Sequence, residues 1–504
     1  MTRTAAEIGA GLAATRAARP IRAGERIHVI GVAGAGASAA ALLAHAAGAT
    51  VSGCDSGGPS PYTPALEATG IEMAWSHDPA HVTTSPAPDR LAVSKALTAV
   101  APDHPELAAA RAAGIPIEPW QQVVADAAFG KRLVAVAGTH GKSTTAGWLT
   151  HVLVAAGHDP SAFVGALLPS SITGGLPATA RQGRGEVFVV EADEYAGNFD
   201  AYHPDVVAIT NVDWDHPDVF ADRAAVVDAF AAWLANAPGA IVIANVGDPG
   251  VVELLARVRD HTGRVIPATV SDGATQAVHA DVRASTGVAG REGTVTSIVI
   301  GREPAFEVAL PTAGAHNVAN ALLVAATGEV LGLRVDEIRS GLESFPGVGR
   351  RLERKGEGGG VVVYDDYGHH PTAIRATIQA VRQREPGRRL WVAIEPLTFH
   401  RTAALLNELA GALADADGVA VADIWAGRDP DRTVASAEGL AKAVRALVPG
   451  KPVAASGPVE ATTDWLAERV APGNVVLVMG GGRSYVIAER LLEVLHARDA
   501  VTDG

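Results

Sequence analysis

Short apolar runs rich in β-branched residues recur along the chain and alternate with longer stretches rich in alanine and leucine. The runs include RIHVIGV, RLVAVAG, EVFVVEA, VVAITNV, GAIVIANV, VVVYDD, LWVAIEP, GVAVADI and NVVLVMG. Strands that are buried on both faces have this continuous apolar pattern, and helices between them indicate βαβ units. The pattern therefore predicts an α/β protein with parallel, doubly wound sheets.

Three segments in which a strand runs into a polar loop divide the sequence into three predicted domains. They span residues 1–130, 131–346 and 347–504. The first strand of the first domain starts at Ile27, and the second domain starts with a strand over Leu133–Ala137 and ends at the turn signal Phe345–Gly347. Residues 280–311 alternate between apolar and polar positions, which predicts an antiparallel segment inside the second domain.

Composition limits the classes of function. Apolar residues make up 48% of the chain and charged residues 19%, as in globular proteins, and a length of 504 residues suits about three domains of roughly 150 residues each. The net charge of −14 argues against a nucleic-acid-binding surface. Cys54 is the only cysteine, which excludes an intrachain disulfide and a metal cluster of several thiolates. We find no signal peptide and no apolar run of membrane-spanning length, so we expect a cytoplasmic protein without membrane insertion.

The segment AGTHGKSTT, residues 137–145, predicts a phosphate-binding loop. It differs from G-x-x-x-x-G-K-[ST], because Val136 stands where that pattern has its first glycine. We expect a strand over Val134–Ala137, a turn over Gly138–Gly141 and a helix from Ser143, whose N-terminus would attract an anion. Lys142 would reach the β- and γ-phosphates and the Ser143 hydroxyl would suit Mg²⁺. The alternative is a plain strand–turn–helix with a surface lysine.

Two further predicted strands end in acidic and polar residues. VVEADE ends in Glu191, Asp193 and Glu194, and carboxylates at such a position suit magnesium. ITNVDWDHPD contains His216, which would ligate a metal or order a phosphate-bound ion. Taken alone, VVEADE is more often a solvated strand end, and an Asx-rich turn is the alternative for ITNVDWDHPD.

Polar residues with amide and guanidinium groups follow in the second half of the chain. Asn317 and Asn320 in GAHNVANA stand one helical turn apart, so that two amides would read a base edge, although a helix-capping role for Asn317 is the alternative. The segment GRRLER supplies Arg350 and Arg351.

The third predicted domain has two strand ends with candidate chemistry. VVVYDDYGHHP ends in Asp365, Tyr367 and His370, and EPLTFHRT contains Arg401, which suits a carboxylate ligand. Adjacent histidines rarely ligate one ion together, so we disfavour a zinc site at residues 369–370.

A glycine-rich loop also follows the first predicted strand. GVAGAGAS precedes an alanine-rich helix, and Asp55 follows at the distance of a ribose-binding acid. The loop suits a diphosphate but does not by itself establish a nicotinamide site, and the second phosphate loop argues against a dehydrogenase.

Taken together, these motifs resemble the Mur ligase family, ATP-dependent ligases of bacterial cell-wall precursor synthesis. The resemblance is collinear from about Ile27 to about Gly482. The family's ATP loop reads G-T-[HN]-G-K-[ST]-T, which Gly138–Thr144 matches, so Val136 is no defect. The resemblance implies a Rossmann-like UDP-binding domain, a central P-loop ATPase-like domain and a C-terminal Rossmann-like domain that binds the amino acid.

The resemblance also implies site residues. The ATP-binding set is Gly138, Thr139, His140, Gly141, Lys142, Ser143, Thr144, Asn317, Asn320, Arg351 and Asp365. The metal ligands are Ser143, Glu191 and His216, and the catalytic residues are Lys142, His216 and Arg351. The UDP-sugar-binding set is Gly31, Gly34, Gly36, Ser38 and Asp55. The amino-acid-binding set is Tyr367, His370 and Arg401.

The branch of the family that joins L-alanine to the carboxylate of UDP-N-acetylmuramate matches best. No lysine stands between Lys142 and Lys355, whereas later-acting branches typically use a modified lysine there. The resemblance implies ATP and Mg²⁺, an acyl-phosphate intermediate, and a role in peptidoglycan synthesis and so in cell shape and division. Tyr195 and Ala373 favour the alternative, attachment of a recycled murein tripeptide. The altered stretch Glu395–Thr402 motivates another, a nucleotide-binding relative without catalysis.

Overall fold

The computed structural model describes residues 4–271, 280–427, 429 and 431–502. These residues form three sheets and two compact units. The first unit comprises the described residues up to Thr286 together with Thr296–Leu310 and Val318–Val348. The second comprises Gly287–Val295, Pro311–Asn317 and the described residues from Gly349 onward. In the described part of the chain, no helix is both long and apolar enough to cross a lipid bilayer.

The first sheet has five parallel strands in the order β3-β2-β1-β4-β5. Its strands are β1 (Arg26–Ile30), β2 (Thr50–Cys54), β3 (Glu72–Ala74), β4 (Arg90–Val93) and β5 (Ile117–Pro119). The helices of this region are α1 (Ala5–Ile8), α2 (Ala35–Ala46), α3 (Pro64–Ala68), α4 (Ala80–Thr83), α5 (Lys95–Val100), α6 (Pro105–Ala113) and α7 (Trp120–Ala127). This strand order is that of a Rossmann-like sheet, in which ligands bind beside the carboxyl end of β1.

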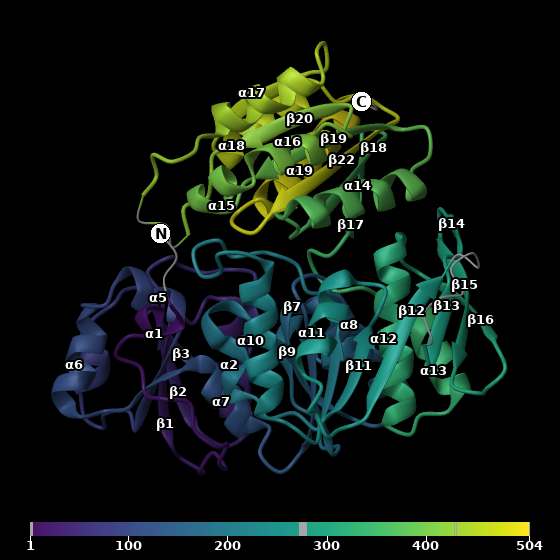
Figure 1. Cartoon of the computed structure of the whole chain (residues 1–504). Helices are drawn as coiled ribbons and strands as arrows, with labels where there is room; N and C mark the ends of the chain where they lie inside the picture. The colour runs from purple at the N-terminus through teal and green to yellow at the C-terminus, as the bar shows by residue number, and fades with distance from the viewer. Residues whose placement is uncertain (1–3, 272–279, 428, 430, 503–504) are drawn as a thin grey trace. The chain divides into compact units, whose positions relative to one another are not determined.

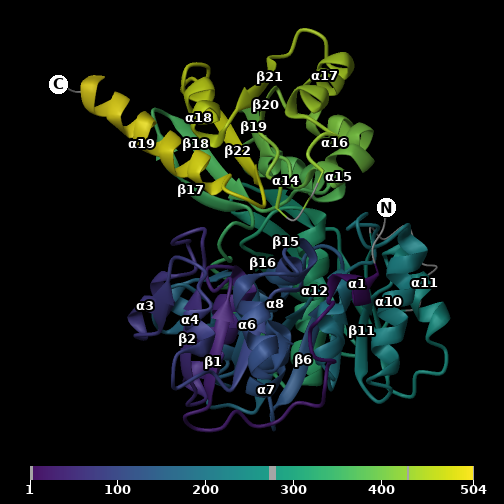
Figure 2. The same ribbon diagram turned by 90° about the vertical axis from the view of Figure 1, so that its left-hand side faces the viewer.

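Alternate residues of β1 point to opposite faces of this sheet. Ile27 and Val29 pack in the cluster that contains residues of α2 and α7, whereas Ile30 packs with Leu107 of α6 and Val82 of α4. Figure 2 shows α4 and α6 beside β1 and β2. The side-chain period of two along a strand places His28 on the same face as Ile30.

The second sheet has eleven strands, in the order β14-β15-β13-β12-β11-β10-β6-β9-β7-β8, with β16 paired to β15. The strands are β6 (Arg132–Ala137), β7 (Ser161–Leu168), β8 (Ala178–Arg181), β9 (Val187–Ala192), β10 (Val206–Ile209), β11 (Ile241–Asn245), β12 (Val265–Ser271), β13 (Val282–Ser285), β14 (Val288–Gly290), β15 (Gly293–Ile300) and β16 (Phe306–Leu310). The antiparallel segment predicted over 280–311 is present in β13–β15, except that β13 is parallel to β12.

Helices cover both faces of the parallel part of this sheet (Figure 1). They are α8 (Lys142–Ala155), α9 (Ser170–Thr173), the 3₁₀ helix η1 (Tyr195–Ala201), α10 (Arg223–Ala235), α11 (Pro249–Arg257), α12 (Ala315–Val330) and α13 (Val335–Glu343). In β6, Ala135 packs toward Phe230 of α10, and Val134 and Val136 pack with Trp148 of α8. The continuous apolar run of β6 is thus explained by burial on both faces.

Helix α2 connects the first two sheets. It contacts β1 and β2 on one side and β7 and β8 on the other. The Ser38 hydroxyl lies 3.0 Å from Oγ1 of Thr179, and Lys95 Nζ donates to the carbonyl oxygens of Ala196 and Gly197 at 2.8 Å. These buried polar contacts fix the first glycine loop relative to the second sheet.

The third sheet lies in the second compact unit and has six strands, in the order β17-β18-β22-β19-β20-β21. The strands are β17 (Glu353–Gly358), β18 (Val361–Asp366), β19 (Arg389–Glu395), β20 (Gly418–Ala422), β21 (Val453–Gly457) and β22 (Asn474–Gly480). The helices are α14 (Pro371–Arg384), α15 (Phe399–Ala404), α16 (Leu406–Leu413), α17 (Ala437–Leu447), α18 (Val459–Ala467) and α19 (Tyr485–Thr502). Only β17 is antiparallel to its neighbour, so this sheet too is doubly wound.

Candidate functional site

Residues 138–141 join β6 to α8 in a turn that requires glycine at both ends. Gly138 and Gly141 have φ of 134° and 82°, which L side chains rarely adopt. A Cβ on Gly138 would lie 2.1 Å from Oγ1 of Thr210, and one on Gly141 would lie 2.8 Å from Oδ1 of Asn320. Val136 is a fully buried residue of β6, so the turn starts only at residue 138.

The end of β10 holds this turn. The backbone N–H groups of Thr139 and His140 donate to Asn211, at 3.0 Å to its carbonyl oxygen and 2.9 Å to its Oδ1. The Thr210 hydroxyl donates to the His140 carbonyl oxygen at 2.6 Å. Thr145 N–H donates to the Gly141 carbonyl oxygen at 3.0 Å, and the preceding N–H groups lie at the helix N-terminus, where anions bind. Helix α8 begins at Lys142, one residue before the predicted Ser143.

Lys142 folds back over the turn. Its Nζ donates to the Gly138 carbonyl oxygen at 2.6 Å and to Oε2 of Glu194 at 2.9 Å, and lies 3.5 Å from Oδ1 of Asp193. Burial would lower the pKa of Lys142, but the carboxylates of Glu194, Asp193 and Glu191 raise it, so the ammonium stays charged. Burial raises the pKa of Glu194 to about 7 against the opposing effect of Lys142. A terminal phosphate would compete with these carboxylates for the ammonium.

Ser143 and Glu191 meet at the point where the sequence predicts a magnesium ion. The Ser143 hydroxyl donates to Oε1 of Glu191 at 2.9 Å, and the Gly165 N–H donates to its Oε2 at 2.6 Å. Both side chains are buried. A hydroxyl and a carboxylate oxygen are ligands that Mg²⁺ prefers, so this donor pair fits the predicted ion.

His216 belongs to a neighbouring acidic group. One ligand atom each of Asp193, Glu194 and His216 lies within 4.8 Å of the others. The His216 backbone has φ of 55°, and its ring centroid lies 4.9 Å from that of Tyr195. The sequence predicts His216 in one ligand set with Ser143 and Glu191. In the structure, the acidic residues next to His216 are Asp193 and Glu194, which belong to the same EADE segment as Glu191.

The two predicted adenine-side asparagines both lie in α12. Nδ2 of Asn317 donates to the Ala313 carbonyl oxygen at 2.8 Å, whereas a helix-capping side chain would accept from a backbone N–H. Asn320 packs against Gly141 of the turn. Both side chains are 5% exposed. Within the first unit, Asn320 is thus next to the phosphate loop. His140 and Thr144 of the predicted set are half-buried members of the same β6–α8 connection.

The first glycine loop is closed by Asp55. Gly31 has φ of 78°, and its N–H donates to the Cys54 carbonyl oxygen at 2.8 Å. The Gly34 N–H donates to the Gly31 carbonyl oxygen at 3.0 Å. Asp55 accepts from the N–H of Ala33 at 3.3 Å and from the N–H of Gly57 at 2.8 Å. The predicted ribose-binding acid is therefore adjacent to the loop and partly engaged by its backbone.

Gly36 and Ser38 of the same predicted set face the protein interior. A Cβ on Gly36 would lie 2.2 Å from Cζ2 of Trp120, so glycine permits close packing of α2 against α7. Ser38 is fully buried, and its hydroxyl donates to the Ala35 carbonyl oxygen at 2.9 Å in addition to the Thr179 contact. The close approach of Gly36 to Trp120 and the contacts of the Ser38 hydroxyl are therefore structural.

The remaining predicted residues lie in the second compact unit. Asp365 is fully buried and accepts a 3.0 Å hydrogen bond from Nε of Arg350, and burial raises its pKa to about 6 against the effect of that guanidinium. The Arg351 guanidinium carbon lies 5.0 Å from the ring centroid of Tyr367. Arg350 is not among the predicted site residues, although its hydrogen bonds to Asp365, Gly480 and Ser484 anchor this segment.

His370 and Arg401 are also buried in that unit. His370 precedes α14, and its Nδ1 accepts from the Thr372 N–H at 3.3 Å. Arg401 lies in α15 and is 3% exposed. In the third sheet, His370 follows the carboxyl end of β18, and Arg401 follows the carboxyl end of β19.

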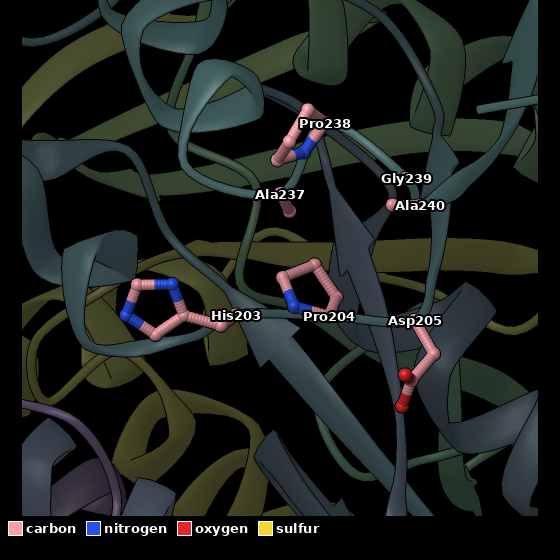
Figure 3. A pocket seen from close by; sticks show the side chains of 7 residues that line it. All are labelled: His203, Pro204, Asp205, Ala237, Pro238, Gly239 and Ala240. Atoms are coloured by element: carbon pink, nitrogen blue, oxygen red, sulfur yellow. The ribbon is translucent and has the colours of Figure 1, made fainter. Parts of the chain in front are cut away.

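A pocket of about 310 Å³ lies at the other end of the second sheet. His203, Pro204 and Asp205 precede β10, and Ala237 to Ala240 precede β11 (Figure 3). The phosphate loop follows the carboxyl end of β6, which is parallel to β10. The pocket is therefore at the opposite edge of the sheet from the candidate site.

Comparisons with known proteins agree on one family. Three family models match the chain: "Mur ligase family, catalytic domain" at residues 26–132, "Mur ligase middle domain" at 136–328 and "Mur ligase, glutamate ligase domain" at 350–482. A UDP-N-acetylmuramate–L-alanine ligase of Frankia casuarinae is 37% identical, over 94% of this chain and 98% of the relative. One from a Nocardioides species is 38% identical, over 93% and 96%.

Two solved structures share the fold. The UDP-N-acetylmuramate-alanine ligase MurC of Thermotoga maritima superposes with a TM-score of 0.75 at 24% identity, covering 94% of this chain and 99% of that one. The murein peptide ligase of Psychrobacter arcticus superposes with a TM-score of 0.71 at 24% identity, with the same coverage.

Proposed function

This chain belongs to the Mur ligase family, and we propose that it joins L-alanine to the carboxylate of UDP-N-acetylmuramate at the expense of ATP. The relatives that match over nearly their whole length are named for this reaction. The reaction would supply the first amino acid of a peptidoglycan precursor, and its nucleotide substrates favour a cytoplasmic location.

The observation that carries this proposal is the arrangement around the turn at 138–141. A helix N-terminus, a charged lysine and a hydroxyl–carboxylate pair meet at the carboxyl edge of one parallel sheet. These groups are what phosphoryl transfer requires, because the protein's part is to position the nucleotide and to stabilise charge on the transferring phosphoryl group.

Chemistry at this site proceeds in two steps. A carboxylate is a poor electrophile, so one of its oxygens first attacks the γ-phosphorus of ATP, and the bond from that phosphorus to the β–γ bridging oxygen breaks to release ADP. The amine of L-alanine then attacks the carbon of the acyl phosphate. The C–O bond to phosphate breaks, the nitrogen loses a proton to solvent, and an amide and inorganic phosphate remain.

The positive charge of Lys142 would stabilise the phosphoryl group as it is transferred. Its ammonium would exchange Glu194 for the β- and γ-phosphate oxygens, and the Gly138 and Gly141 turn would bring backbone N–H groups to them. Arg351 of the second unit would add a further cation. We assign Lys142, His216 and Arg351 as the catalytic residues on this basis.

Ser143 and Glu191 would hold Mg²⁺, which when bound neutralises charge on the phosphates. The buried pair offers one hydroxyl and one carboxylate oxygen. Asp193, Glu194 and His216 would hold a second divalent cation near the carboxylate substrate. Both proposed ligand sets are rich in oxygen atoms, which would suit a hard cation.

We further propose which residues bind each substrate. ATP would be bound by Gly138, Thr139, His140, Gly141, Lys142, Ser143, Thr144, Asn317, Asn320, Arg351 and Asp365. The UDP-sugar would be bound by Gly31, Gly34, Gly36, Ser38 and Asp55, in part through the backbone, because Gly36 has no side chain and the Ser38 side chain is buried. The amino acid would be bound by Tyr367, His370 and Arg401. The corresponding domains are 1–130, 131–346 and 347–504.

The experiment that tests this function is phosphate release from ATP with UDP-N-acetylmuramate and Mg²⁺, with L-alanine, L-serine, glycine and a murein tripeptide as separate acceptors. Turnover that requires L-alanine supports the proposal. Turnover with the tripeptide alone would contradict it and would make Tyr195, which packs against His216, the residue to study. Nucleotide binding without turnover would indicate a non-catalytic relative.

A further inference from the structure

A second group of metal-ligating side chains lies in the first sheet, apart from the phosphate loop. His28 comes from β1, Cys54 from the end of β2, His81 from α4 and Glu106 from α6. One ligand atom of each lies within 4.8 Å of the others. Residues 25 positions or more apart in sequence therefore meet on the face of the sheet that α4 and α6 cover (Figure 2).

Glu106 is at the centre of this group. Its Oε1 lies 3.0 Å from Nδ1 of His81, and its Oε2 lies 3.1 Å from Sγ of Cys54 and 3.4 Å from Nε2 of His28. Glu106 and Cys54 are fully buried, and His28 is 2% exposed. Nδ1 of His28 is held at 2.9 Å by the Ser52 hydroxyl, which directs the other ring nitrogen toward Glu106.

Two further histidines, His77 and His104, pack around the group, and some ring nitrogens in this region have no hydrogen-bond partner in the described part of the chain. Among the described residues, Nε2 of His28 and both ring nitrogens of His104 are buried without a hydrogen-bond partner. Nδ1 of His77 lies 3.3 Å from Sγ of Cys54, and its ring meets that of His104 with centroids 4.4 Å apart. Buried polar atoms without partners are costly and are rare in folded proteins. Nε2 of His28 forms no hydrogen bond with any described residue and lies among metal-ligating atoms, which indicates that a metal ion binds there.

The spacing suits a tetrahedral ion. Four ligand atoms about 2.0–2.3 Å from one zinc ion stand roughly 3.3–3.8 Å apart. Glu106 lies 3.0 Å from His81 through Oε1 and 3.1–3.4 Å from Cys54 and His28 through Oε2, and one ligand atom of each of the four residues lies within 4.8 Å of the others, so side-chain adjustments would bring all four to one ion. The ligand set of two imidazoles, one thiolate and one carboxylate is of the kind that zinc uses, and it is unlike the oxygen ligands at Ser143 and Glu191.

We infer that His28, Cys54, His81 and Glu106 form a zinc-binding site in the N-terminal domain, with His77 and His104 packed around it. This site is independent of the proposed ligase reaction. It would tie α4 and α6 to the ends of β1 and β2, and Cys54 precedes Asp55, which closes the first glycine loop. Zinc would therefore stabilise the loop proposed to bind the UDP-sugar.

Protons must leave when zinc binds. Burial and the Glu106 carboxylate raise the pKa of the Cys54 thiol, which donates to Glu106 in this structure. The ion would displace the thiol proton to solvent and bind the resulting thiolate.

The test is a cobalt titration of the untagged full-length protein after dialysis against a chelator, with excess Mg²⁺ present throughout. Co²⁺ reports a thiolate ligand through a charge-transfer band in the near ultraviolet. We expect one Co²⁺ per chain, with that band, and displacement of the band by Zn²⁺. A wild-type protein that takes up no Co²⁺, or takes it up without the thiolate band, would overturn the inference.

Variants separate this site from other histidines and from the magnesium ligands. His81→Ala should lose the ion, and Cys54→Ser should lose the band and bind more weakly. His45→Ala, at an exposed position on α2, and Ser143→Ala should both leave the titration unchanged. Because ligand variants can unfold, circular dichroism is recorded for each, and Zn²⁺ should raise the Tm of the wild type but not of folded Cys54→Ser. An equal Tm shift in both proteins would also overturn the inference.

Discussion

The hydroxyl of Ser143 donates a 2.9 Å hydrogen bond to Oε1 of Glu191. This bond connects the first turn of α8 to β9, the strand adjacent to β6 in the second sheet. The Gly165 N–H holds the other carboxylate oxygen and so fixes its orientation. The two oxygens are therefore positioned before any cation binds, and the cation requires only that the hydroxyl proton rotate away.

Ser143→Ala should raise the Mg²⁺ concentration needed for half-maximal ligation. Loss of one ligand, or of the group that orients it, typically weakens metal affinity about tenfold to a hundredfold. Steady-state rates measured over a Mg²⁺ series at saturating ATP would show this shift. Ser170→Ala, at an exposed position in α9, is the matched control and should behave as the wild type. An unchanged Mg²⁺ dependence in Ser143→Ala would remove this residue from the proposed ligand set.

Lys142→Ala should lower kcat by roughly a hundredfold to a thousandfold, the usual cost of removing one preorganised electrostatic group. The reason is that its ammonium is held charged beside the phosphate turn by Glu194 and Asp193. Initial rates of phosphate release are the measurement. Lys442→Ala, at an exposed position in α17, is the control. If Lys142→Ala retained wild-type kcat while folding normally, phosphoryl stabilisation by this residue would be refuted.

Gly36→Ala should destabilise the protein by about 1–3 kcal/mol, as overpacking of a core does. The added methyl group would lie 2.2 Å from the Trp120 ring, so α2 and α7 would have to separate. The effect is measured as the change in the free energy of unfolding of the first unit in urea. Gly239→Ala has no atom within 4 Å of its added Cβ and should change stability by less than about 0.5 kcal/mol.

Arg350→Met should destabilise the second unit by about 3–5 kcal/mol near neutral pH, because it leaves the Asp365 carboxylate buried without its cation. Burial raises the pKa of Asp365 to about 6, above its unfolded value, so its ionisation costs stability as pH rises from about 4 to about 6. Without Arg350 that pKa rises further, so the variant should lose less stability at about pH 5 than at about pH 8.

Urea unfolding at both pH values measures this difference. Arg350→Met combined with Asp365→Asn should show a smaller dependence on pH than Arg350→Met alone. A loss of stability independent of pH would mean that Arg350 acts through its contacts with Gly480 and Ser484 instead.

Much of this fold follows from the apolar pattern. All nine apolar runs form strands, and the predicted Mur ligase family and its three-domain α/β architecture are confirmed. Strands such as β3 and β5 were missed because three residues with few β-branched side chains give no periodic signal. Single-residue boundaries, such as the start of α8, depend on hydrogen bonds that a pattern does not show.

The candidate site was harder to predict than the fold. The glycine turn and the Ser143–Glu191 pair follow from motif spacing, since both lie at strand ends of one sheet. The buried contacts of Ser38 depend on packing between two sheets, which the sequence does not encode locally. The group around Glu106 was missed for the same reason: its members are scattered over four elements, and a single cysteine gives no metal-binding spacing.

The measurement that tests the central claim most directly is transfer of a heavy-oxygen label. UDP-N-acetylmuramate labelled in its carboxylate is incubated with ATP, Mg²⁺ and L-alanine, and the product amide and the phosphate are analysed by mass spectrometry. If the carboxylate is activated as an acyl phosphate, one labelled oxygen appears in phosphate for each alanyl product formed. Amide formation without label in phosphate, or phosphate release without any alanyl product, would contradict the account.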